Sequence, residues 1–175
     1  TGAAPRGEGV GNGMATAILF AREGAKVVLV NRSAERAEAL AKRIRDEGGE
    51  ASVFAADVAK ADEAEAMAAF AEKTYGRLDI LHNNVGIGGP GTPETVTLET
   101  WNKVLEANLT TTMLCTKACL PRMKAGGGGS VIMVSSIAGA LGLMGSAGAV
   151  AYATAKAGLH GFTLSVAADY ATQNI

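Results

Sequence analysis

Helical and extended hydrophobic patterns alternate along the whole chain. Segments with apolar residues at the three- and four-residue spacing of a helix face predict helices over 14–22, 33–48, the stretch around Met67 to Tyr75, 98–124 and 152–172. Short apolar runs lie between them and are typical of buried strands: 26–30, 51–56, 78–82 and 131–134. Strands that alternate with helices through short connections predict βαβ units. The fold class is therefore expected to be α/β, with a doubly wound parallel sheet and helices on both faces.

The domain organisation is expected to be simple. The 175 residues contain no internal repeat and no linker-like change of composition, so 1–175 is predicted to be one domain. The chain opens on Thr1-Gly2 without a methionine and stops at Ile175 without a helix-capping signal. We therefore expect a domain that is incomplete at both ends.

Charge and cysteine content exclude several classes of protein. Sixteen Lys and Arg against 17 Asp and Glu, with no basic run, argue against a nucleic-acid surface. Cys115 and Cys119 have no His or acidic neighbour at metal-ligand spacing, so no metal site is expected. Reduced structural thiols and the lack of a signal-peptide pattern favour a cytoplasmic protein.

One stretch, 130–155, carries no charged residue and is long enough to cross a membrane. Its glycines, its Ser and Thr residues and its change of pattern at Ser136 favour a buried strand, a loop of small residues and a helix that begins near Tyr152. No membrane contact is therefore expected.

A glycine-rich loop, 1–13, leads directly into the first helix. Ligands of doubly wound sheets bind beyond the carboxyl ends of the strands. Glycines let backbone N–H groups approach a phosphate, and a helix N-terminus adds partial positive charge. The loop therefore predicts a phosphate-binding site, although loops also collect glycine for other reasons.

The residues that follow the predicted strand 26–30 bear on the type of nucleotide. Enzymes of this fold that use NAD place an acidic residue there to bind the ribose 2′-hydroxyl. Here Asn31, Arg32 and Ser33 occupy the position, and Arg6 lies in the glycine loop. Guanidinium and hydroxyl groups suit a 2′-phosphate, which favours NADP over NAD; the alternative is that Arg32 only flanks a solvent-facing helix start.

A Tyr-x-x-x-Lys pattern, Tyr152 to Lys156, opens the last predicted helix. Four residues make about one helical turn, so the phenol and the ammonium share a face. A nearby cation favours the phenolate, which makes Tyr152 a usable acid or base; a buried Tyr beside a structural Lys is the alternative. Ser136 ends the preceding strand, where a hydroxyl can stabilise charge that develops on a reacting oxygen.

Taken in order, these motifs resemble the short-chain dehydrogenase/reductase family. The similarity extends to Asn83-Asn84-Val85-Gly86, to Asn108 within Glu106-Ala-Asn-Leu109, and to the Thr1-Gly2 opening of the loop. Three departures stand out: the loop is five residues longer than the family pattern, Val85 replaces an alanine, and the Ser136–Tyr152 spacing is three residues longer. Alignment from Glu23-Gly24-Ala25 matches the fingerprint glycines to Gly11 and Gly13, and either Gly2 or Gly7 to the first, with Gly2 favoured by Thr1.

The resemblance implies a Rossmann-type NAD(P)-dependent oxidoreductase that transfers a hydride between nicotinamide and a secondary alcohol or ketone. It implies that Tyr152 exchanges a proton with the substrate oxygen, Ser136 orients that oxygen, Lys156 binds the nicotinamide ribose, and Asn108 holds a water of the proton relay. Asp57 would help hold the adenine. The expected cofactor-binding residues are Gly2, Arg6, Gly11, Asn12, Gly13, Asn31, Arg32, Ser33, Asp57, Val58, Asn84, Val85, Gly86, Tyr152 and Lys156.

Further expectations concern partners and alternatives. The family's first strand, which lies centrally in the sheet, and its substrate-covering helices have no counterpart in 1–175, so the substrate is not readable and the fragment alone could lack activity. The family pairs its two long helices between subunits, which implies a homodimer or homotetramer. Other readings are a non-catalytic nucleotide sensor and another Rossmann-type enzyme such as a methyltransferase. His82, inside a strand, is expected to be a packed core histidine.

Overall fold

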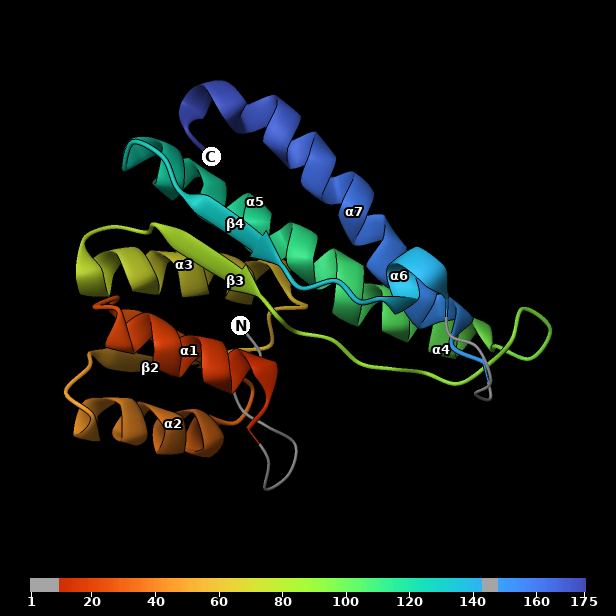
Figure 1. Cartoon of the computed structure of the whole chain (residues 1–175), viewed down its shortest axis with the longest axis horizontal. Helices are drawn as coiled ribbons and strands as arrows, with labels where there is room; N and C mark the ends of the chain where they lie inside the picture. Colours follow the sequence, from red (N-terminus) through yellow and green to blue (C-terminus); the bar gives the residue numbers. More distant parts are fainter. Residues whose placement is uncertain (1–9, 143–147) are drawn as a thin grey trace.

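A computed structural model of the chain describes residues 10–142 and 148–175. Helices and strands alternate through them (Figure 1), which confirms the α/β fold class. The elements are α1 (Asn12–Arg22), β1 (Val27–Asn31), α2 (Ala34–Asp46), β2 (Ala51–Ala55), α3 (Ala61–Tyr75), β3 (Ile80–Asn83), α4 (Leu98–Leu105), the π-helical turn η1 (Glu106–Thr110), α5 (Thr111–Ala125), β4 (Ser130–Met133), α6 (Ala138–Leu141), α7 (Val150–Tyr170) and the 3-10 turn η2 (Ala171–Gln173).

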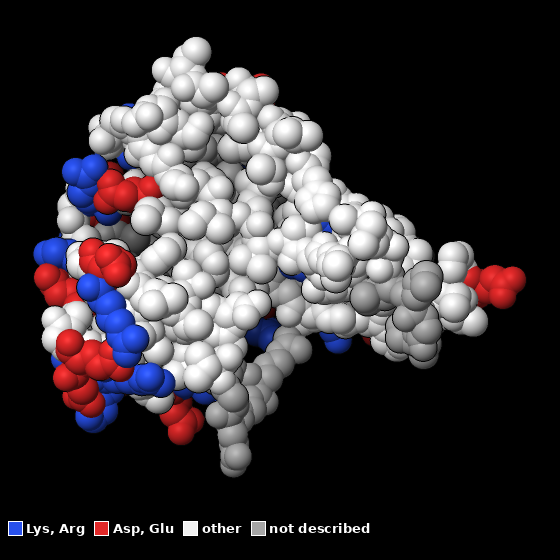
Figure 2. Space-filling model, in the orientation of Figure 1, with Lys and Arg blue, Asp and Glu red and all other residues white. Residues whose placement is uncertain are grey.

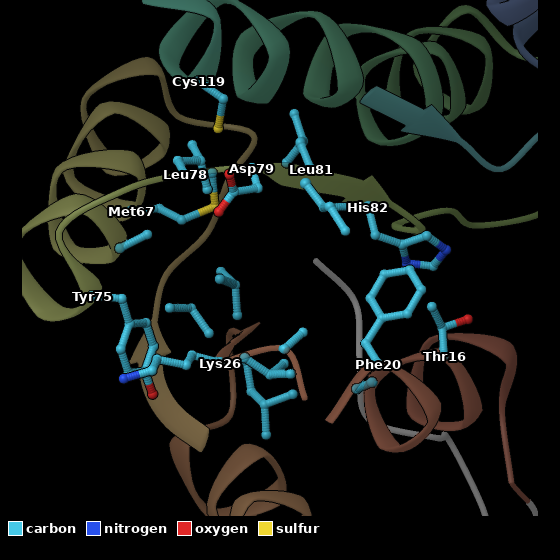
Figure 3. Close-up of a pocket in the computed structure, with 18 of the residues that line it drawn as sticks. Thr16, Phe20, Lys26, Met67, Tyr75, Leu78, Asp79, Leu81, His82 and Cys119 are labelled. Atoms are coloured by element: carbon cyan, nitrogen blue, oxygen red, sulfur yellow. The ribbon is translucent and has the colours of Figure 1, made fainter. Parts of the chain in front are cut away.

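The four described strands form two parallel pairs. β1 pairs with β2, with Val27 opposite Ala51, and β3 pairs with β4, with Ile80 opposite Ser130. Within the described residues no ladder joins the two pairs. A cavity of about 380 Å³, lined by residues of both β1 and β3, lies between them (Figure 3). The predicted sheet is therefore present as two halves.

Helices cover both faces of β1. Successive strand side chains point to opposite faces, and the neighbours Leu29 and Val30 belong to different cores. Leu29 packs with residues of α1, α2 and β2: Ala17, Ile18, Ala21, Ala37, Leu40, Ala41, Ile44 and Ala51. Val30 packs with residues from α3, β3, α5 and the segment after β2: Ala56, Val58, Ala64, Met67, Ala68, Leu81, Cys115, Ala118, Cys119 and Met123.

Helix α2 follows its sequence signals closely. Ser33 caps it, since its Oγ accepts a hydrogen bond from the Arg36 N–H at 3.3 Å. Gly48, just beyond the helix, has the left-handed φ of +88° that glycine adopts without strain. The expected inner face of Ala37, Leu40, Ala41 and Ile44 is buried.

Two expectations about helices are wrong in detail. The helix predicted over 98–124 is interrupted by the π-helical turn η1 between α4 and α5. The loop predicted between Ser136 and Tyr152 contains the short helix α6, and α7 already begins at Val150. Phe70 of α3 is half-buried and packs on Phe54 with ring centroids 5.0 Å apart.

The two thiols lie in the protein core. Cys115 and Cys119 are free and buried in α5, and burial raises their pKa to about 11 and about 12. Over 10–142 and 148–175, no helix is long and apolar enough to cross a membrane. In the same ranges no group of three His, Cys, Asp or Glu side chains could hold a metal ion.

Candidate active site

Tyr152 and Lys156 lie on the first turns of α7, as the one-turn spacing predicts. The Lys156 Nζ lies 5.7 Å from the centroid of the Tyr152 ring. Lys156 is only 4% exposed, and burial lowers its pKa. Its Nζ donates a 2.7 Å hydrogen bond to the carbonyl of Val134, the residue that follows β4. A nearly dehydrated cation is thus held beside a phenol at the end of a strand.

Asn108 lies fully buried in the π-helical turn η1. Its Nδ2 donates to the carbonyls of Ile87 and Val104, both at 2.8 Å. Its Oδ1 has no hydrogen-bond partner among the described residues. Because an unpaired buried acceptor is costly, this oxygen marks a place where a further donor belongs.

Gly86 brings the two groups together. A Cβ built on Gly86 would lie 2.6 Å from Asn108 Oδ1 and 3.4 Å from Lys156 Nζ. The loop after β3, the turn η1 and helix α7 therefore converge on one point, although they are far apart in the sequence. A side chain at this position would clash with Asn108 Oδ1, so only glycine leaves the amide its place beside Lys156.

The hydroxyls of two buried threonines support the π-helical turn. Thr111 Oγ1 donates to the Glu106 carbonyl at 2.8 Å, and Thr112 Oγ1 donates to the Asn108 carbonyl at 3.1 Å. A π turn widens the helix and frees carbonyls from regular pairing, so these bonds stabilise it. Sequence reasoning did not find Thr111 or Thr112, since hydrophobic spacing carries no signal for one extra residue in a turn.

Ser136 follows β4, two residues after the carbonyl that holds Lys156. It is half-buried, and its Oγ accepts the Ala138 N–H at 3.2 Å at the start of α6. Its own proton remains available for a ligand oxygen. Helix α6 packs closely on α7: a Cβ at Gly139 would lie 2.6 Å from the carbonyl carbon of Lys156.

The described part of the glycine loop leads into α1. Gly11 is the extended N-cap residue with φ −77° and ψ 158°, followed by Asn12, and Gly13 is buried in the helix. Gly11 has no side chain to cap α1, so among the described residues no side chain caps the first turn, whose backbone N–H groups are suited to an anion. Gly2 and Arg6, also expected here, lie outside the described residues.

The turn after β1 presents one exposed cation. Asn31 Oδ1 accepts the Ser33 N–H at 2.9 Å, so Asn31 and Ser33 shape the turn and the start of α2. Arg32 between them is exposed and takes part in no ion pair of the described residues. The position of the acidic residue expected of an NAD enzyme is thus held by a neutral amide beside a guanidinium.

The segment after β2 combines a turn with core packing. Asp57 Oδ1 accepts the Ala59 N–H at 3.3 Å, and the Asp57 N–H donates to Glu63 Oε2 at 2.6 Å. Val58 is 5% exposed and belongs to the core beneath α3 and α5. Val85 packs on the same core, while Asn84 beside it is half-buried. The side chains of both valines are therefore used for packing, and any cofactor contact they make would come from the main chain.

Asn83 and His82, at the carboxyl end of β3, make different contacts: Asn83 forms a hydrogen bond to α5, and His82 packs on an aromatic ring of α1. Asn83 is 4% exposed, and its Nδ2 donates to Thr116 Oγ1 at 3.3 Å, which ties β3 to α5. Sequence reasoning quoted Asn83 only as part of a motif. His82 is half-buried and meets Phe20 edge-on at one side of the cavity, with ring centroids 6.2 Å apart (Figure 3). Burial lowers its pKa, which agrees with a packed neutral histidine.

Charged side chains gather away from this site. Figure 2 shows them mostly at the edge of the molecule where the strands begin, while most of the remaining face is uncharged. Ion pairs occupy that edge: Arg22–Glu47, Lys26–Glu50 and Arg77–Asp79. The site residues lie at the opposite, carboxyl ends of the strands.

Comparison with known proteins agrees with this arrangement. The family model described as short chain dehydrogenase matches residues 5–175. A crystal structure described as that of a short-chain dehydrogenase/reductase from Burkholderia xenovorans superposes with a TM-score of 0.93 at 39% identity and covers 99% of this chain and 68% of that one.

Curated relatives carry several activities in their names. A 3beta-hydroxysteroid dehydrogenase of Mediterraneibacter gnavus is 37% identical over 94% of this chain and 59% of the relative. A 3-oxoacyl-[acyl-carrier-protein] reductase of Synechocystis is 38% identical over 94% and 66%. A cis-4-hydroxycyclohexanecarboxylate dehydrogenase of Sinomonas cyclohexanicum is 39% identical over 97% and 67%. The chain thus spans roughly three fifths to two thirds of their length, and it belongs to the short-chain dehydrogenase family.

Proposed function

We propose that the full-length protein containing this chain is an NAD(P)-dependent oxidoreductase that interconverts a secondary alcohol and a ketone. The observation that carries the proposal is the convergence of Asn108 Oδ1 and Lys156 Nζ on Gly86, with Tyr152 one turn from Lys156. A structural Tyr–Lys pair would not require a fully buried amide with an unpaired oxygen at the same point.

The residues present fit a nicotinamide dinucleotide. The N-terminus of α1 at Gly11 to Gly13, where the N-cap residue has no side chain, suits its diphosphate, and the close approach of Asn108 and Lys156 at Gly86 places an ammonium at the carboxyl ends of the strands, where the nicotinamide half is expected. The ammonium of Lys156 can donate to ribose hydroxyls in addition to the Val134 carbonyl, because it carries three protons. When bound, the nicotinamide supplies or takes up a hydride.

The chain's own side chains supply the proton chemistry. In reduction, the Tyr152 phenol donates its proton to the carbonyl oxygen of the substrate, and in oxidation the phenolate takes it back from the alcohol. Lys156 places its positive charge 5.7 Å from the centroid of the Tyr152 ring, where it attracts the negative charge that proton transfer leaves on the phenol oxygen. The Ser136 hydroxyl donates a hydrogen bond to the same substrate oxygen. Asn108 Oδ1 accepts from a water that renews the proton, which gives its unpaired lone pairs a partner.

The preference for NADP over NAD rests on Arg32. A guanidinium that is exposed beside the neutral Asn31, and that pairs with no described carboxylate, is suited to a 2′-phosphate. Ratios of kcat/KM for the two nucleotides test this preference.

The cavity between β1 and β3 supports a further strand in the full-length protein. Among the described residues no ladder joins β1 to β3 across this cavity, and its lining is largely apolar, including Val28, Leu81 and Cys119 (Figure 3). A parallel strand would join the two halves into one sheet. Hydrogen exchange at the amides of β1 and β3 should be slower in the full-length protein than in residues 1–175 alone.

Pairing of subunits through the long helices would cover apolar side chains that α5 and α7 expose. Met113 of α5 is 37% exposed and Leu164 of α7 is 73% exposed. A homodimer or homotetramer would bury them, and light scattering on the full-length protein measures its mass.

The deciding experiment is a nicotinamide absorbance assay of the full-length protein against a panel of ketones and secondary alcohols. Tyr152→Phe should lower turnover by about 10²–10⁴-fold while nucleotide binding stays within a factor of about two. Tyr170→Phe is the matched control, because Tyr170 also lies on α7 with a lysine, Lys124, 5.8 Å from its ring centroid. Activity above a few per cent in Tyr152→Phe would refute the assignment.

A further inference from the structure

Ser135 has no role in the chemistry described above, yet it makes two contacts with α7. Its Oγ donates to the main-chain carbonyl of Lys156 at 2.8 Å. The same Oγ lies 2.9 Å from Nε2 of His160. Ser135 is half-buried just after β4, and His160 is exposed one turn after Lys156. Both contacts therefore join the carboxyl end of β4 to the helix that carries Tyr152 and Lys156.

The protons in this group can be assigned. A serine hydroxyl has one proton, and a carbonyl oxygen can only accept, so the Ser135 proton points to the Lys156 carbonyl. The contact with His160 then requires that Nε2 carries a proton and donates it to Ser135 Oγ. Neutral His160 is thereby assigned the tautomer protonated at Nε2.

Lys156 is held by neighbouring residues at three different points. Val134 accepts from its Nζ, Ser135 donates to its carbonyl, and the backbone of Gly139 packs against its peptide group. These three residues lie in the segment that also carries Ser136. The rotation and height of α7 against this segment therefore determine where Tyr152 stands relative to Ser136.

We propose that Ser135 and His160 are positioning residues, which act through the main chain of Lys156 to hold Tyr152 and Lys156 in register with Ser136. This inference rests on the proposed function. Misplacement of a catalytic group by even 1 Å can cost about 10²-fold in rate, so loss of one such contact is expected to affect chemistry more than nucleotide binding.

A matched control lies one turn further along α7. Thr163 Oγ1 contacts Met133 Sδ at 3.1 Å and donates to the Leu159 carbonyl at 2.7 Å. It joins the same two elements, β4 and α7, but does not contact Lys156. A merely structural role would make Thr163→Val and Ser135→Ala behave alike.

The test compares variants of the full-length protein by kcat, by KM for the nucleotide and by the pH dependence of kcat/KM. Ser135→Ala should lower kcat about tenfold and displace the pH profile, with KM for the nucleotide within a factor of about two. Ser135→Thr keeps a hydroxyl and should restore most of the rate. His160→Gln keeps a donor and should be milder than His160→Leu. Thr163→Val should lower the melting temperature without moving the pH profile.

Two results would overturn the proposal. One is a Ser135→Ala protein with the parental kcat and pH profile, or a Ser135→Thr protein that does not recover the rate that Ser135→Ala loses. If Ser135→Ala does not fold, a His160→Leu protein with the parental kcat and pH profile overturns the proposal instead. The other comes from ¹⁵N NMR of the ring of neutral His160, which needs no substrate: a proton on Nδ1 in place of Nε2 contradicts the contact. Absence of turnover in the parent protein would instead contradict the proposed function, while the NMR measurement still tests the contact.

Discussion

The two ends of the parallel strands differ in how their polar groups are satisfied. Where the strands begin, charges lie in water and pair with one another, as Lys26 does with Glu50 at 3.2 Å. Where β3 and β4 end, the groups are neutral amides and hydroxyls around one buried ammonium, and the Oδ1 atoms of Asn83 and Asn108 have no partner among the described residues. At the first edge the charged groups pair with one another. At the second edge two buried amide oxygens can accept hydrogen bonds that no described residue donates, and a ligand or a water molecule can supply those donors. The difference favours the carboxyl ends as the place where a ligand binds, without reference to any motif.

The largest loss of activity is expected from a side chain added at Gly86, among the groups at the carboxyl ends of the strands. In Gly86→Ala the new methyl group would lie 2.6 Å from Asn108 Oδ1, whose amide cannot yield easily because two hydrogen bonds hold it. We expect kcat/KM to fall by about 10²-fold or more, since the Asn108 amide must move away from its place beside Lys156.

Gly88→Ala is the control for that variant, because nothing lies within 4 Å of a Cβ at Gly88 in the same loop. Steady-state kinetics and melting temperature are measured for both. Equal kinetics in the two variants would show that convergence at Gly86 has no functional consequence.

A smaller effect is expected at the turn after β1. Arg32→Ala should raise KM for NADPH about tenfold and leave KM for NADH nearly unchanged, because only the 2′-phosphate requires the guanidinium. Arg36→Ala, an exposed arginine one turn into α2, is the control. A strong preference of the parent protein for NADH would contradict the assignment of NADP.

Some of these features were accessible from sequence and some were not, for a physical reason. The Ser33 cap, the inner face of α2 and the Tyr152–Lys156 pair depend on spacing within one element, which sequence expresses directly. The π-helical turn η1 depends on Asn108 reaching the Ile87 carbonyl, 21 residues away along the chain. Local propensity contains no information about such a contact.

The same reasoning applies to Ser135 and to the sheet. The two adjacent serines look alike in sequence, and only their geometry separates Ser136, which accepts an N–H in its own turn, from Ser135, which reaches across to α7. Four strands were predicted and are present, but hydrophobic runs do not tell which edges pair. The hydrophobic pattern alone therefore does not separate β1 from β3, whereas the family resemblance already implied that a central strand has no counterpart in 1–175.

The buried ammonium predicts a pH dependence of stability. Burial lowers the pKa of Lys156 below its usual 10.5, so the unfolded chain binds more protons between the two values, and this residue's contribution to the free energy of unfolding rises with pH across that window. Lys156→Met should flatten the rise measured by chemical denaturation from neutral to alkaline pH. Lys103→Met, at an exposed position of α4, should leave it as in the parent. An unchanged slope in Lys156→Met would mean that water reaches the ammonium freely.

The smallest effect is expected where the strands begin. In the Lys26–Glu50 pair both side chains are more than half exposed, and such pairs contribute about 0–1 kcal/mol. Glu50→Gln should therefore change the free energy of unfolding by less than about 1 kcal/mol, with any change disappearing at 1 M salt. Its kcat/KM should equal that of the parent, because the site draws on buried neutral groups and one buried cation at the opposite edge. A loss of turnover in Glu50→Gln would show instead that the charged edge acts on the site through the strands. The inference that only the carboxyl ends of the strands contribute to activity would then be wrong.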